Sequence, residues 1–129
     1  MINFLTKGLT KIFGTKSDKD IKVVLPYVDQ TNSEFDKLKN VSDDELRAGK
    51  EKIKEEINEG LRHIDDQIEE LNKKIKDDPN MDIHHKEEIF GQIDKLEEDR
   101  NKDLEEILLQ VLPRAFAIVK ETARRFKEN

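Results

Sequence analysis

Two neighbouring histidines and the carboxylates around them are the residues of this chain best suited to bind a metal ion. His84 and His85 follow Asp82, and His84 shares one helix face with Glu88 at four-residue spacing. A zinc site needs three or four such ligands in fixed positions. Adjacent histidines point to different sides of a helix and no third ligand is fixed, so we expect a solvated tip without a metal.

The remaining candidates for chemistry have plainer interpretations. His63 stands beside an apolar stripe without a nucleophile or paired acid nearby in the sequence, which favours a structural histidine over a general base. Paired carboxylates such as Asp43-Asp44 and Glu55-Glu56 are expected to be solvated in a chain with 30 acidic residues. The phosphate-binding pattern GxxxxGK[ST] is absent from this sequence. We therefore predict no catalytic residue and no cofactor in this chain itself.

The composition favours extended helices over a compact core. Charged residues make up 42% of the 129 residues and hydrophobic residues 34%, which leaves little for a globular interior. The sequence holds no cysteine, no secretory signal and no apolar run of ~18 residues, so we predict a cytoplasmic protein. A net charge of −6 argues against nucleic acid as a main partner.

The first arm of a helical hairpin begins at a clear start signal. In residues 41–46, Ser42 can cap the helix, Glu45 can reach back to the cap amide, and Val41 can pack on Leu46. A narrow apolar seam follows at helical spacing, and polar residues fill the other positions. The seam residues are Ile53, Ile57, Leu61, Ile64, Ile68, Leu71 and Ile75.

A second arm returns after a turn near residues 77–82, where Pro79 cannot continue a helix. Its seam residues are Ile89, Phe90, Ile93, Leu96, Leu104, Ile107, Leu108, Val111 and Leu112. A short connection makes the arms antiparallel neighbours, each up to ~50 Å long. The predicted fold class is all-α: a long antiparallel, coiled-coil-like helical hairpin with shorter N-terminal helices packed at its base.

A symmetric turn predicts which residues face one another. Leu96 is expected opposite His63 and Ile64, and Ile107 opposite Lys52 and Ile53. Residues 97–103 contain no apolar side chain. On the other arm, Gly60 costs about 1 kcal/mol in helix propensity. We therefore expect a loosely packed, charge-paired waist at this height.

The chain before the hairpin divides into two predicted segments. Residues 1–16 carry three lysines and no acid, with apolar residues at helical spacing, and Gly14-Thr15-Lys16 predicts a helix stop. This basic amphipathic segment could lie on an anionic membrane, dock in a partner groove, or form a frayed end. Residues 17–40 form a helix that Pro26 kinks or divides, with another break allowed near Thr31.

The base of the hairpin domain, residues 41–129, is its most apolar part. Residues 113–127 form a base helix that is either a kinked continuation or a fresh helix with Pro113 in its first turn. The apolar face of residues 17–40 should pack here, because nothing else can cover it. The predicted core members are Leu109, Leu112, Phe116, Ile118, Val119 and Phe126.

Three passages, taken in order, match one family. Residues 12–21 read IFGTKSDKDI, residues 41–48 read VSDDELRA, and residues 111–125 read VLPRAFAIVKETARR. They resemble the start of SecA, the bacterial preprotein translocase motor family, in which LSDEELRAKT and LPEAFAVVREAAKR are similar to the last two. Arg114 replaces the usual acid after the proline. Residues 51–106 stand where most members have a short link, which predicts a lineage-specific insertion that forms the hairpin.

The resemblance implies an N-terminal fragment of a larger ATPase that exports preproteins through the SecYEG channel, on the inner face of the cell membrane. ATP and Mg are implied for the full-length protein, because the sequence ends before the place of the family's nucleotide-binding motifs. The implied partners are the SecYEG channel, anionic lipid, the preprotein and the remainder of the chain. The residues assigned to membrane or translocon contact are Phe4, Leu5, Lys7, Leu9, Lys11, Ile12 and Phe13.

A second interpretation belongs to another class of protein. A stand-alone coiled-coil module could scaffold partners or dimerise through the same seam, so a homodimer stays open. In either case the two arms must pack on each other or on a second copy.

Overall fold

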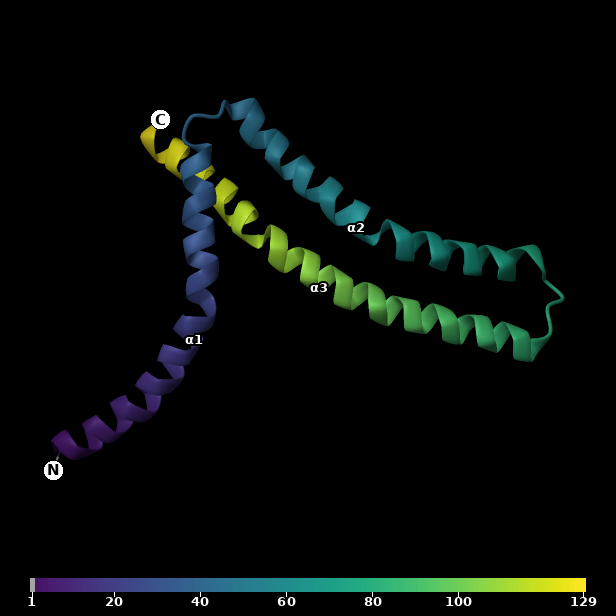
Figure 1. The fold of residues 1–129 in the computed structure, drawn as a ribbon, viewed down its shortest axis with the longest axis horizontal. Coiled ribbons are helices and arrows are strands. Elements are labelled where there is room, and N and C mark those ends of the chain that lie inside the picture. The colour runs from purple at the N-terminus through teal and green to yellow at the C-terminus, as the bar shows by residue number, and fades with distance from the viewer. Residues whose placement is uncertain (1) are drawn as a thin grey trace.

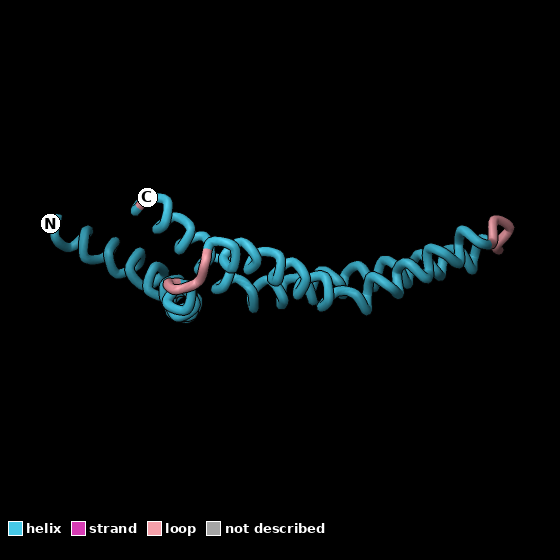
Figure 2. Tube along the Cα trace, turned by 90° about the horizontal axis from the view of Figure 1, so that it is seen from above, coloured by secondary structure: helices cyan, strands magenta, loops and turns pink. Residues whose placement is uncertain are grey.

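The computed structural model describes the backbone of residues 2–129 and the side chains of residues 16–129. It contains three helices, α1 (Ile2–Leu38), α2 (Asp43–Asp77) and α3 (Ile83–Glu128), and no strand over the described part. Helices α2 and α3 lie side by side and antiparallel, whereas α1 crosses the base of this pair and leads away from it (Figures 1 and 2). The predicted all-α hairpin is confirmed.

The predicted capping box starts α2. The Ser42 hydroxyl accepts from the Glu45 amide at 3.2 Å, and the Ser42 amide donates to the Glu45 carboxylate at 2.7 Å. The hydrogen bond from the Ser42 amide is the main cause of a lowered pKa at Glu45. Three acidic residues fill the first turn, where negative charge suits the helix dipole.

The turn at the far end is held by two aspartates. The Asp78 carboxylate accepts from the Asn80 amide at 3.2 Å. Asp82 is the N-cap of α3, and its carboxylate accepts from the amides of His84 and His85 at 3.1 and 3.4 Å. The turn therefore has its own polar network, and it lies at the end of the hairpin far from the base (Figure 1).

The seam closes within one molecule, but Phe90 and Leu108, which were predicted as seam residues, are exposed. Leu61 and Ile64 of α2 and Ile89 and Ile93 of α3 are all buried. The flanking seam residues are half-buried, as a two-helix interface without a third layer requires; these are Ile57, Ile68, Leu71, Ile75, Leu96, Leu104 and Ile107.

The register differs from the one that a symmetric turn predicts. Ile107 lies against Gly60, about two helical turns from the predicted Lys52 and Ile53. Helical side chains lean toward the N-terminus of their own helix. In an antiparallel pair the two leans are opposed in space, so facing side chains belong to residue numbers about one higher on each helix, which accounts for only part of the offset.

The waist is charge-paired, as predicted, but it is not loose. Arg100 of α3 binds Asp65 of α2 through Nε at 2.6 Å and Nη2 at 3.4 Å, and this hydrogen bond is the main cause of a lowered pKa at Asp65. The helices approach closely here, since a Cβ on Gly60 would lie 2.5 Å from Cδ1 of Ile107. The prediction of loose packing was therefore wrong at Gly60, where the missing side chain lets the helices meet.

Two glycine substitutions test this close approach. Gly91→Ala is expected to raise the free energy of unfolding by about 0.5–1 kcal/mol, because alanine favours the helix more than glycine does and nothing lies within 4 Å of the added methyl. Gly60→Ala should gain less, or lose stability, because the methyl displaces Ile107. Urea unfolding followed by circular dichroism measures both. Equal gains at the two positions would contradict the close contact.

Helix α1 is continuous, so the predicted stop at Gly14-Thr15-Lys16 was wrong. A single glycine costs only about 1 kcal/mol, which a helix of 37 residues tolerates. Pro26 lies inside the helix without dividing it, and α1 bends between its two halves (Figure 1). No break occurs near Thr31, whose hydroxyl donates to the Tyr27 carbonyl within the helix at 2.6 Å. Helix α3 likewise continues through Pro113.

Candidate docking site at the base of the hairpin

The base of the hairpin is organised around one buried acid, Glu121, which is 0% exposed. Its carboxylate accepts from Arg124 at 2.7 and 2.9 Å and from Nε of Arg125 at 2.8 Å. The hydrogen bonds from Arg124 and then Arg125 lower the pKa of Glu121 from 4.5 to about 2. A buried carboxylate with two arginine partners remains ionised at neutral pH.

Arg125 connects α3 to the link between α1 and α2. Its guanidinium donates to the carbonyl oxygens of Leu38 and Val41 at 3.2 and 2.6 Å, and to Asp43 at 2.6 Å. The last carbonyl groups of a helix have no partner within the helix, so Arg125 completes the end of α1. Together with Glu121, it fixes the place where α1 meets the hairpin.

The C-terminal half of α1 packs on α3. The Lys120 ammonium lies 4.3 Å from the centre of the Phe35 ring and donates to the Asn32 side chain at 2.8 Å. Phe35 and Leu38 are half-buried in this contact region. Helix α3 therefore has α2 on one side and α1 on another.

A third face of α3 remains uncovered at the base. Phe116 is 54% exposed, Val119 65% and Phe126 81%. Leu109 also lies half in solvent. We call these four residues the base face. Large apolar side chains grouped on one helix face typically mark an interaction site.

The exposure of the base face shows that part of the predicted core was wrong. Leu109, Phe116, Val119 and Phe126 are exposed, whereas Leu112 and Ile118 are half-buried. The buried positions of this part of α3 are Val111, Pro113, Ala117 and Glu121. Apolar residues surround α3 here on nearly every side, so the sequence pattern does not say which sides the other helices cover. Ala117 and Glu121 were missed because a small residue and an acid give no hydrophobic signal.

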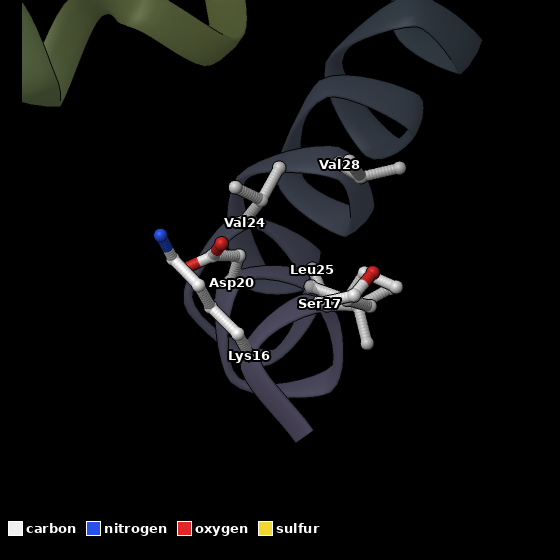
Figure 3. A pocket seen from close by; sticks show the side chains of 7 residues that line it. Lys16, Ser17, Asp20, Val24, Leu25 and Val28 are labelled. Atoms are coloured by element: carbon white, nitrogen blue, oxygen red, sulfur yellow. The ribbon is translucent and has the colours of Figure 1, made fainter. Parts of the chain in front are cut away.

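A second apolar face lies on α1 around Pro26, mostly on its N-terminal side. Ile21, Val24, Leu25 and Val28 are all exposed along one shallow hollow, with Lys16 and Asp20 at its edge (Figure 3). The prediction that this face packs on the base of the hairpin was wrong for these residues. The contact with α3 is made further along α1, around Phe35 and Leu38.

The predicted contact residues of the N-terminus have side chains outside the described part. Phe4, Leu5, Lys7, Leu9, Lys11, Ile12 and Phe13 belong to the backbone of α1, and their contact with membrane or translocon stays a prediction.

Metal binding and membrane crossing find no support in the described residues. Asp82, near the two histidines, is engaged as the cap of α3. Residues 16–129 contain no group of three or more histidine or acidic side chains suited to hold a metal ion. Within the part of the chain that the structure describes, no helix has the length and apolar character needed to cross a membrane.

Comparison with known proteins identifies relatives of the whole hairpin. The family model described as SecA DEAD-like domain matches residues 9–129. The protein translocase subunit SecA of Cytophaga hutchinsonii is 53% identical over 121 residues, which is 94% of this chain and 11% of the relative. The SecA subunits of Amoebophilus asiaticus and Chloroherpeton thalassium are each 40% identical, over 97% and 94% of this chain and 11% and 12% of their own.

These alignments are too long to omit residues 51–106, so the relatives have a corresponding sequence in this part of the chain. The chain spans about a tenth of the length of the curated relatives it matches. No solved structure matches the chain.

Proposed function

We propose, because this chain belongs to the SecA family, that it is the N-terminal part of an ATP-driven preprotein translocase subunit. The whole protein would bind ATP and Mg, use ATP hydrolysis to drive preproteins through the SecYEG channel, and work at the inner face of the cell membrane. This chain lacks the phosphate-binding pattern, so its own part is mechanical. It braces the nucleotide-binding domain and contacts the membrane or channel.

The observation that carries the bracing role is the base face of α3. Phe116, Val119 and Phe126 lie in solvent beside a rigid, fully paired network at Glu121. Burying one such side chain is worth about 1.5–3 kcal/mol. The relatives are about nine times longer than this chain, so the remainder of the protein is the natural occupant of this face.

Binding in trans tests the bracing role. The chain is mixed with a polypeptide that contains the remaining residues of the Cytophaga hutchinsonii relative, and calorimetry measures the dissociation constant. The double variant Phe116→Glu/Val119→Glu is expected to weaken binding by about thirtyfold or more, as the loss of a central apolar anchor does. The matched control Val23→Glu changes an exposed valine of α1 and should bind as the unmodified chain does.

Two results would count against the bracing role. One is equal binding by the double variant and the control. The other is self-association of the chain through the base face with no binding to the remaining residues, which favours the dimerisation module. The seam cannot serve that module, because Leu61, Ile64, Ile89 and Ile93 are already buried within one molecule.

The proposed membrane contact rests on the sequence of residues 2–13. The three lysines and the absence of acid in residues 1–16 suit an anionic surface. Flotation with anionic vesicles should recover the chain, whereas neutral vesicles should not. Deletion of residues 1–14 should abolish recovery. Equal recovery with both vesicle types, or no loss on deletion, would refute the contact.

A further inference from the structure

The distal half of α3 carries a second apolar stripe, away from the seam. Ile83 and Phe90 are seven residues apart, so they lie on one helix face, and they are 66% and 47% exposed. Their neighbours Ile89 and Ile93 are buried against α2. The distal helix thus has one apolar face that α2 covers and, on another side, two apolar side chains that no described residue covers. Helix α1 lies at the opposite end of the hairpin (Figure 1).

The charges on this stripe are all negative. At alternating steps of four and three residues the stripe reads Ile83, Glu87, Phe90, Asp94 and Glu97, and we call these five residues the distal face. Its three acids are exposed. The nearby ion pairs, Arg100 with Asp65 and Lys102 with Asp99, use other carboxylates. Among the side chains that the structure describes, the three acids of the distal face therefore have no basic partner.

We propose that the distal face docks a cationic amphipathic helix from another polypeptide. Ile83 and Phe90 would bury the apolar stripe of that helix. Glu87, Asp94 and Glu97 would pair with lysines or arginines at its edges. Such complementarity fixes orientation and speeds association. An anionic membrane or a nucleic acid would instead be repelled by the three carboxylates.

A labelled peptide with leucines at three- and four-residue spacing and lysines elsewhere is the probe. Fluorescence anisotropy measures its binding to the full chain, and a peptide with glutamate in place of each lysine is the control ligand. The first variant, Ile83→Ala/Phe90→Ala, removes the apolar anchors. The second, Glu87→Gln/Asp94→Asn/Glu97→Gln, removes the charges. Both sets of side chains are exposed, so the fold should persist, which circular dichroism verifies.

A matched variant separates the distal face from the overall charge. Glu55→Gln/Asp66→Asn/Glu69→Gln removes three exposed acids from α2 instead. We expect both distal-face variants to weaken binding of the lysine peptide by about tenfold, whereas the α2 variant stays within about twofold. Binding should also weaken as salt is added.

Three results would overturn the proposal. The first is equal weakening by the distal and α2 charge variants, which would indicate attraction to net charge alone. The second is binding that Phe116→Glu/Val119→Glu abolishes and the distal variants leave intact, because the peptide would then occupy the base face. The third is a failure to bind the peptide together with self-association that the distal variants abolish, which would assign the face to a second copy. The third result does not affect the bracing role, because that role is tested separately, by binding of the chain to the remaining residues of the relative.

Discussion

Replacement of Leu61 by alanine is expected to lower the free energy of unfolding by about 2–5 kcal/mol, the range for deleting a buried leucine side chain. Leu61 is 2% exposed at the centre of the seam, next to the point where Gly60 and Ile107 bring the helices together. Small domains are stable by about 5–15 kcal/mol in total. A single truncation at this position therefore removes a large share of the stability of the hairpin.

Urea unfolding followed at 222 nm measures the loss at Leu61. The matched control is Leu109→Ala, which makes the same chemical change at a position half in solvent and should cost about 0.5 kcal/mol. Equal losses at the two positions would mean that the seam is not the core of the molecule. Helix propensity cannot account for a difference, because both residues lie inside helices.

Glu121→Gln is expected to cause the largest loss of stability among substitutions of single acids in this chain. The amide has only one oxygen to accept hydrogen bonds, and it removes the one buried charge that Arg124 and Arg125 share. Each arginine then keeps only an exposed partner, Glu128 for Arg124 and Asp43 for Arg125. Arg125 then holds the Leu38 and Val41 carbonyl groups less firmly. The contact between α1 and the hairpin should loosen with it, which hydrogen exchange at the end of α1 would report.

The same substitution should change the response to acid. The folded-state pKa of Glu121, about 2, lies below its ordinary value of 4.5. The carboxylate therefore contributes stability that is fully present above pH 4.5 and is lost as the pH falls from 4.5 to about 2. Glu45 and Asp65 also have lowered pKa values, so the unmodified chain loses stability on acidification. Glu121→Gln should lose less over the same window.

Thermal unfolding at a series of pH values measures both effects. Asp43→Asn is the control, because Asp43 binds Arg125 in the same network but is largely exposed, where an ion pair is worth about 1 kcal/mol or less. Its melting temperature should stay close to that of the unmodified chain at neutral pH. If the melting temperatures of Glu121→Gln and of the unmodified chain fell in parallel as the pH is lowered, Glu121 would not be a source of the acid sensitivity.

Local signals in this sequence were enough to predict most of the helical architecture. The capping box at Ser42 and Glu45, the proline at position 79 and the two spaced seams each act over a few residues, so they can be recognised without knowing what lies across the interface. They gave the all-α class and the antiparallel hairpin. The stop predicted at Gly14 was wrong because one glycine weakens a helix without ending it.

The tertiary structure alone decided which faces are covered and which are free. A helix that is apolar nearly all round, as α3 is near Phe116 and Val119, does not reveal how many neighbours it has. Glu121, Arg124 and Arg125 are neighbours on one helix face, but only the fold brings the linker onto Arg125 and buries Glu121. The facing of Gly60 and Ile107 depended on the register of the two helices, which the position of the turn alone did not fix. Sequence patterns thus determined where the helices form, and the packing of three helices determined which surfaces remain for a partner.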